Sequence, residues 1–251
     1  MSTWDDRHRP GDGHGLAADS SSFRKLCRSS PWRWETLQCE YWDEPFISGP
    51  SPGAVLVRAW VKRPGALRVE DVDGVLLESS SGGSGSPAGL YTGASRKSWL
   101  LPPQLVTPVY DDAGLVTRRP EAAYGDPGFG SGCFSAALDP VELTGNFPVP
   151  IEFPGSNPVL VTEVVRTEQD SRPALEAIVV PTVAYHPAHQ LMPLCLPGRT
   201  LIRIDLQTGI CVASRSLEPA TAQHGHWLRI IEVDGYCSDQ LFDEPVPTTN
   251  L

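Results

Sequence analysis

The chain has 251 residues, a formal net charge of −10 and 40% hydrophobic residues. A chain of this length can bury a proper core, and we expect one large domain in preference to two small ones. The acidic balance argues against non-specific binding of nucleic acid, because a phosphate backbone attracts clustered Lys and Arg. With 23 Gly and 25 Pro residues the chain can hold little helix, so strands and loops are expected to dominate.

The first 21 residues are polar and rich in Gly and Asp, so 1–21 is predicted to be a disordered tail. This stretch has no apolar run of the length that a secretory signal or a transmembrane helix needs. We therefore expect a cytoplasmic protein with no integral membrane segment. In a reducing compartment the six cysteines, which include no C-x-x-C pair, are expected to be buried or half-buried thiols. In an exported protein their even number would permit disulfides.

The N-terminal half is predicted to hold one short helix and a meander of strands. An apolar stripe at helical spacing indicates a helix over 22–28, and alternation indicates a first strand over 35–44. The strand 54–63 is the strongest of this half, with small and branched apolar residues at every second position. Pro-Gly and Asp-Gly turns then connect it to strands over 67–72 and 75–79.

In the middle of the chain, 87–130, long regular elements are prevented by Pro102, Pro103, Pro108, Pro120 and Pro127, so only short strands are expected there. The segment 132–138 is compatible with a helix. Asp139 then precedes Pro140, and Glu142 follows three residues after the Asp. This is a capping-box arrangement, which predicts a short helix that starts at Pro140.

The C-terminal half is predicted to hold a hairpin, an eighteen-residue loop over 181–198, a second run of three strands and one final helical turn over 238–242. The hairpin pairs 159–168 with 174–181. The later strands span 200–206, 210–216 and 227–234, and the glycine of a Gln-Thr-Gly turn joins the first two.

The last of these strands is apolar on both faces. Trp227 and Ile231 alternate with Leu228 and Ile230. We therefore expect it to be covered on both sides, by a helix, by the other wall of a curved sheet, or by a ligand.

Three phrases in this order resemble the LolA-like fold, which the bacterial lipoprotein carrier shares with the RseB-type stress regulators. They are VRAWVKRPGALRVE at 57–70, LIRIDLQTG at 201–209, and IIEVD at 230–234 with Leu241-Phe242. The resemblance covers roughly residues 33–245. It implies an all-β fold with minor helix: a strongly curved antiparallel sheet that forms a half-open barrel, lidded by short helices. A single domain over 22–245 and a tail over 246–251 are then expected. Members of that family are usually exported, and the concave face can hold acyl chains.

Ten residues are predicted to line a pocket for a hydrophobic ligand in the concave sheet, although a packed core would show the same pattern. They are Leu56, Trp60, Leu67, Val69, Leu160, Val164, Ile178, Trp227, Ile230 and Ile231.

A metal site is the alternative, because His186, His189 and Cys195 lie in one loop, and His224 and His226 could join them. The spacing is not that of a helical H-E-x-x-H motif, since a proline lies between the first two histidines and no Glu is present.

Nucleophilic and phosphate-binding motifs are absent from the sequence. There is no G-x-S-x-G elbow, and the glycines at 128, 130 and 132 lack the Lys of a phosphate loop. We therefore predict a non-catalytic binding protein without a cofactor. Its partner would be a hydrophobic small molecule or lipid, or a protein bound in a regulatory role. The alternative is a metal-dependent enzyme that uses His186, His189 and Cys195.

Overall fold

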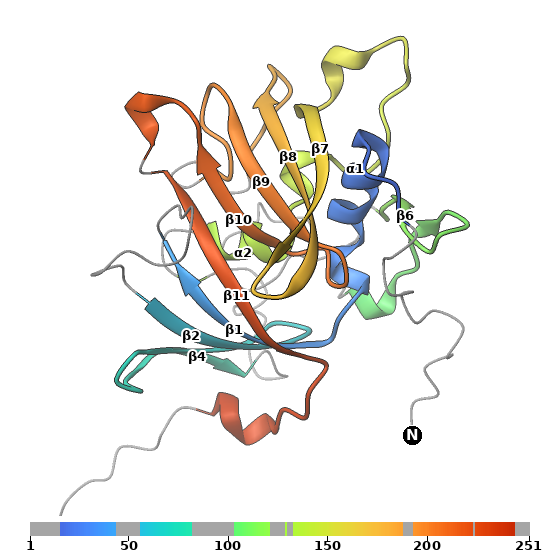
Figure 1. Ribbon diagram of the computed structural model, residues 1–251. Coiled ribbons are helices and arrows are strands. Elements are labelled where there is room, and N and C mark those ends of the chain that lie inside the picture. The colour runs from blue at the N-terminus through green and yellow to red at the C-terminus, as the bar shows by residue number, and fades with distance from the viewer. Residues whose placement is uncertain are drawn as a thin grey trace, which may run out of the picture.

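The computed structural model describes residues 16–43, 56–81, 103–120, 129, 133–187, 193–222 and 224–243. Within these residues, nine strands form one antiparallel sheet in the order β4-β3-β2-β1-β11-β10-β9-β8-β7 (Figure 1). β4 and β7 are its two edges, so the sheet does not close. The predicted fold class is confirmed: a half-open, mostly antiparallel β fold with little helix.

The strands fall where alternation and turn signals predict them, with ends shifted by a few residues. The strands of the large sheet are β1 (Thr36–Trp42), β2 (Leu56–Lys62), β3 (Ala66–Asp71), β4 (Leu76–Ser81), β7 (Val159–Gln169), β8 (Arg172–Pro181), β9 (Thr200–Asp205), β10 (Cys211–Ser216) and β11 (Gly225–Val233). A small second sheet pairs β5 (Val109–Tyr110) with β6 (Val116–Arg118). The α-helices are α1 (Ser20–Ser29) and α2 (Cys133–Leu138), and the short 3-10 helices include η5 (Val141–Leu143), η6 (Pro154–Ser156) and η8 (Asp239–Phe242).

Bulges help to curve the large sheet. On β11, Ile231 is an extra residue, because Gln38 and Cys39 of β1 face Glu232 and Ile230. Similar shifts of register interrupt the pairing of β10 with β9 and of β7 with β8. An extra residue bends its strand and increases the local twist. In Figure 1, β7 to β11 accordingly form one wall, and β1, β2 and β4 lie across its lower end.

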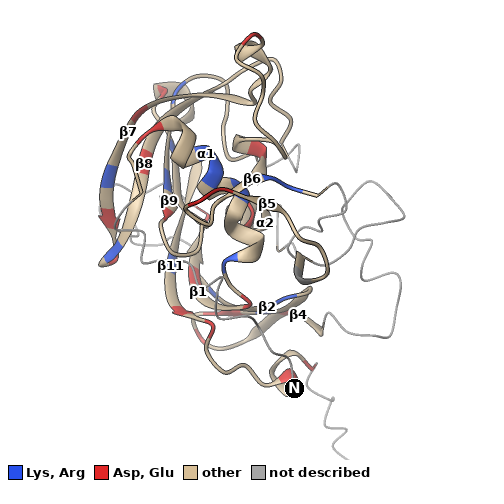
Figure 2. Ribbon diagram, turned by 90° about the vertical axis from the view of Figure 1, so that its right-hand side faces the viewer, with Lys and Arg blue, Asp and Glu red and all other residues tan. Residues whose placement is uncertain are grey.

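The helix α1 lies against the concave face of the sheet (Figure 2). It begins two residues earlier than predicted, because the side chain of Asp19 accepts a hydrogen bond from the Ser22 N–H at 2.8 Å and caps the helix. Its apolar stripe is fully buried, as an amphipathic helix requires. The buried apolar residues of α1 are Phe23, Leu26 and Cys27.

A glycine in the β9–β10 turn lets α1 pack closely on the sheet. Gly209 has φ +74°, and a Cβ atom there would lie 2.7 Å from the Leu26 carbonyl oxygen. Only a residue without a side chain fits this contact. The turn glycine inferred from the sequence therefore also serves the packing of a helix nearly 180 residues away in the sequence.

Side chains from the helices fill the concave face within the described residues. The inward residues of β8 and β9 pack with α1, and those of β1, β2, β3 and β11 pack with Phe134 and Leu138 of α2. The 3-10 helix η5 adds Leu143 to the first of these clusters. The helices are thus part of the core and not a separate lid.

The predicted capping box at Asp139 is wrong. Pro140 is the N-cap residue of η5, which is a 3-10 helix, and it makes no side-chain cap. Both oxygens of the Asp139 carboxylate instead accept from one nitrogen, Nη2, of Arg119, at 3.0 and 2.9 Å. Glu142 points away from the helix start, because it accepts hydrogen bonds from a distant loop. A buried arginine competes better for a carboxylate than a backbone N–H does.

Residues 1–15 and 244–251 lie outside the described residues, and most of the predicted tails fall within them. The domain limits 22–245 stay a prediction.

Candidate functional site

Four of the ten predicted ligand-binding residues face the interior. Leu67, Val69 and Ile230 are buried within one core cluster, in which α2 also takes part. Val164 is partly buried and packs against the other cluster, which contains α1. Helix side chains occupy the positions around these residues that a ligand would otherwise take.

The other six residues lie on the outer face of the sheet. Leu56 and Trp227 form a small cluster there with Trp42 and Ala213. The remaining four occupy separate places: Trp60 lines a pocket beside the C-terminal segment, Ile231 is the bulged residue of β11, and Leu160 and Ile178 belong to β7 and β8.

The structure does not bring the ten residues together, because neighbouring residues of a strand point to opposite faces. The sequence pattern identifies these residues as apolar but does not indicate that they share one face of the sheet. Their role in binding a ligand stays a prediction.

The predicted metal-binding loop does not assemble in the described residues. His186 is exposed, whereas Cys195 is buried, and His189 lies outside the described residues. Burial raises the pKa of the Cys195 thiol well above its usual range. His224 Nε2 lies 2.7 Å from the Pro193 carbonyl oxygen. Among the residues that the structure describes, no three His, Cys, Asp or Glu side chains gather as metal ligands.

A hydrogen-bonded network holds this loop to the core instead. The Tyr185 hydroxyl donates to the Glu142 carboxylate at 2.5 Å and accepts from the Cys195 N–H at 3.1 Å. The same carboxylate accepts from the Leu194 N–H at 2.8 Å. The buried Glu142 is thereby satisfied by two donors, and the loop of Pro and His residues has a structural anchor.

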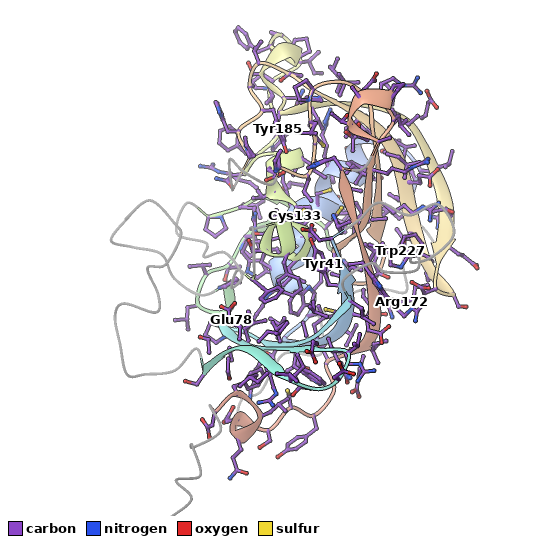
Figure 3. The ribbon with its side chains drawn as sticks, turned by 90° about the vertical axis from the view of Figure 1, so that its left-hand side faces the viewer. Tyr41, Glu78, Cys133, Arg172, Tyr185 and Trp227 are labelled. Carbon is purple, nitrogen blue, oxygen red and sulfur yellow. The ribbon has the colours of Figure 1, made fainter. Side chains whose placement is uncertain are left out.

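A buried cluster around His226 is the feature that sequence reasoning missed. The His226 Nε2 atom lies 2.8 Å from the Cys211 carbonyl oxygen, which can only accept, so Nε2 carries the proton. Nδ1 then accepts from the Ser214 hydroxyl at 2.9 Å, and the Cys133 sulfur lies 3.7 Å away. The ring stacks on Tyr41 with centroids 5.7 Å apart. Tyr41 and Cys133 are labelled in Figure 3.

This cluster is not an activated nucleophile. Burial lowers the pKa of His226 to about 4 and raises the pKa of the Cys133 thiol to about 12, so both groups are neutral near pH 7. A catalytic Cys needs a thiolate and access for the substrate, and Cys133 is only 2% exposed. The cluster is a satisfied polar network in the core, and only the fold brings its members together.

Several large apolar side chains are exposed at one end of the sheet, in the segment 147–158, which we call the apolar loop. It rises beyond the ends of β7 and β8 in Figure 1. Phe147, Ile151 and Phe153 are 57%, 95% and 63% exposed. Val183, in the loop after β8, is 97% exposed. The two loops are joined, since the Thr182 N–H donates to the Pro158 carbonyl oxygen at 2.9 Å.

Proline keeps the apolar loop from forming a strand. Pro148, Pro150 and Pro154 remove backbone donors that a sheet would need. A turn follows, in which the Phe153 N–H donates to the Pro150 carbonyl oxygen at 2.9 Å. Large apolar groups are therefore presented to solvent on a constrained backbone, with Glu152 as the single charge of the segment. Large apolar side chains exposed close together in a chain are typical of interaction sites.

No family model matches this chain, and no curated protein matches it. A solved structure, the crystal structure of MucB, is 15% identical to it, with a TM-score of 0.39. The match covers 91% of this chain and 64% of MucB, so the chain spans less than two thirds of that protein. The likeness is to the fold alone.

The expected cytoplasmic location is contradicted and is not retained. Within the described residues no helix is both long and apolar enough to span a membrane.

Proposed function

We propose that this chain is a non-catalytic binding protein that docks a partner protein through the apolar loop and Val183. The observation that carries the proposal is the exposure of four large apolar side chains, Phe147, Ile151, Phe153 and Val183, on two joined loops. Water contact at such groups is unfavourable, and a partner that covers them gains the corresponding free energy.

A partner protein fits this surface better than a lipid bilayer does. Membrane-surface segments combine apolar residues with Lys and Arg, which anionic lipids attract. The apolar loop contains no basic residue, and the whole chain carries a net charge of −10. A hydrophobic ligand held inside the sheet has less support, since helix side chains pack the concave face.

The expected energies are sufficient for a specific complex. Burying one Phe, Ile or Val side chain contributes about 1.5–3 kcal/mol. Losing one such anchor from the centre of an interface should therefore weaken binding about tenfold or more. Since the anchors are exposed in the free protein, replacing them should change the free energy of unfolding by less than about 0.5 kcal/mol.

The test compares three forms of the protein in affinity capture from the native organism, with quantitative mass spectrometry. The loop variant carries Ile151→Ser, Phe153→Ser and Val183→Ser. Its matched control carries three equivalent changes at the β3–β4 hairpin: Val72→Ser, Val75→Ser and Leu77→Ser, at side chains that are 52%, 57% and 49% exposed.

A protein captured by the wild type and the control, but not by the loop variant, is the candidate partner. The proposal is supported if this purified partner binds the purified wild type and control more tightly than the loop variant. Equal capture by all three forms would contradict it. So would co-sedimentation of the wild type, but not of the loop variant, with phosphatidylcholine–phosphatidylglycerol vesicles, because the occupant would then be lipid.

A further inference from the structure

The C-terminal segment 234–242, which we call the strap, crosses the outer face of the sheet and is fixed to it at both ends. At its start, the Thr36 hydroxyl donates to the Gly235 carbonyl oxygen at 2.8 Å. At its far end, the Arg68 guanidinium donates to the Leu241 carbonyl oxygen at 3.0 Å. Lys62 Nζ also donates to the Cys237 carbonyl oxygen at 3.2 Å. The path of the strap over the sheet is thus determined by side chains of β1, β2 and β3.

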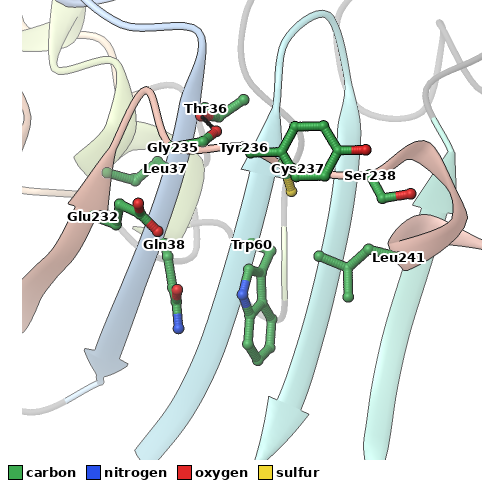
Figure 4. A pocket seen from close by; sticks show the side chains of 10 residues that line it. All are labelled: Thr36, Leu37, Gln38, Trp60, Glu232, Gly235, Tyr236, Cys237, Ser238 and Leu241. Atoms are coloured by element: carbon green, nitrogen blue, oxygen red, sulfur yellow. Dashed lines mark hydrogen bonds between the residues drawn. The ribbon is translucent and has the colours of Figure 1, made fainter.

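Between these contacts the strap leaves a cleft over Trp60. The cleft has a volume of about 280 Å³, and the Trp60 ring lies at its centre, on the outer face of β2 (Figure 4). Leu241 and Tyr236 of the strap and Gln38 and Glu232 of the sheet contribute to its walls. The indole is partly exposed, so a group that enters the cleft can stack on it.

The Glu232 carboxylate provides a negative charge in this cleft. A Cβ atom at Gly235 would lie 2.2 Å from the Glu232 Cδ atom, so the carboxyl group rests directly against the strap. The nearby cations are already paired: Lys62 with Asp239 at 2.5 Å and Arg68 with Glu70 at 2.6 Å. In the described part of the chain no cation pairs with Glu232. The cleft therefore keeps a net negative charge beside an aromatic face.

On the same outer face, a similar pairing of an indole ring with carboxylates already holds a guanidinium group. Arg229 lies over the Trp42 ring, with its guanidinium carbon 5.6 Å from the ring centroid. It pairs with Glu40 at 3.2 Å and with Asp170 at 3.4 Å. The planar guanidinium of Arg229 is thus held between an indole and carboxylates. Trp42 lies on β1, one strand away from Trp60 on β2. The described residues that line the cleft at Trp60 include the aromatic ring and the carboxylate but no Lys or Arg.

We propose that the cleft between the strap and Trp60 binds a guanidinium group, stacked on the indole and paired with Glu232. The group could belong to an arginine side chain of a bound peptide or to a small molecule such as free arginine. A guanidinium group is planar, so it can stack on the flat indole ring. Its positive charge is complementary to the negative charge of the carboxylate. The site lies on other elements than the apolar loop and does not depend on the function proposed for that loop.

The test follows the indole N–H signal of Trp60 in a two-dimensional ¹H–¹⁵N NMR spectrum. The chain has seven Trp residues, and the Trp60 signal is the one that disappears in Trp60→Phe. The probes are acetyl-Gly-Arg-Gly-amide, free arginine, and acetyl-Gly-citrulline-Gly-amide, in which the guanidinium is replaced by a neutral urea of the same shape. The arginine peptide, or free arginine, should shift this signal saturably, and the citrulline peptide should bind at least several-fold more weakly.

Two variants decide the role of the carboxylate. Glu232→Gln should weaken binding of the arginine peptide about two- to fivefold, as expected for an ion pair with an exposed carboxylate. Glu168→Gln removes the same charge from an exposed position on β7 and should leave the affinity unchanged. Affinity should also fall with added salt. Equal binding of the arginine and citrulline peptides, no binding of either arginine probe, or equal affinity in Glu232→Gln and the wild type would each overturn the proposal.

Discussion

Replacing His226 with Gln should remove a large part of the acid sensitivity of the fold. An unfolded chain binds a proton on this histidine near pH 6.5, but burial lowers the pKa in the folded protein to about 4. Between these values the unfolded state binds more protons, so the folded state loses stability as the pH falls. At 1.36 kcal/mol for each pH unit, the complete loss is about 3 kcal/mol, reached near pH 4. Gln keeps an amide donor for the Cys211 carbonyl oxygen and does not titrate.

The assay is urea unfolding of the wild type and of His226→Gln at pH 7 and at pH 4. Both proteins lose stability in acid through their carboxylates, so the difference between them isolates the histidine. The wild type should lose about 3 kcal/mol more than the variant. His186→Gln removes an exposed imidazole and should behave like the wild type. Equal losses in the wild type and His226→Gln, or an NMR titration of His226 well above pH 4, would refute the reasoning.

Two further predictions concern packing. Gly209→Ala should destabilise the protein by at least about 3 kcal/mol, because positive φ and the contact with α1 both disfavour a Cβ atom. The control is Gly114→Ala, at a residue with φ +73° and open space around it, which should cost about 1 kcal/mol. Urea unfolding of the two variants checks this, and similar costs would contradict the close contact. Tyr185→Phe leaves the buried Glu142 carboxylate with one donor fewer and should cost about 1–3 kcal/mol, with faster amide hydrogen exchange at Cys195. Unchanged exchange at that amide would mean that the hydroxyl does not hold the loop.

Sequence reasoning succeeded where the signal is local. Alternation of apolar residues and Gly-containing turns follow from the geometry of a few neighbouring residues, so strands such as β2 and hairpins such as β9–β10 were located correctly. The capping box at Asp139 was also a local inference, and it was wrong because Arg119, twenty residues away, takes the carboxylate. A local pattern predicts a structure only if no distant partner competes for the same group.

The candidate sites could not be found in this way. The ten apolar residues share a pattern but not a face, and the bulge at Ile231 changes the register of β11 in a way that composition does not show. The exposure of Phe147 and Ile151 was equally hidden, since an apolar residue in a Pro-rich link is as compatible with a packed interior as with a projecting loop. The cleft at Trp60 exists because the strap returns to the sheet some 175 residues later in the sequence.

The sequence by itself determined an antiparallel, half-open β fold with few helices, because side-chain alternation, glycine turns and proline breaks act over a few residues. Only the tertiary structure decided that the helices fill the concave face, that His226 is a buried neutral imidazole, and that exposed apolar side chains and a negatively charged cleft lie away from that face. Burial, pKa and surface exposure depend on contacts between residues far apart in the chain, and these contacts exist only once the sheet has curved around its helices.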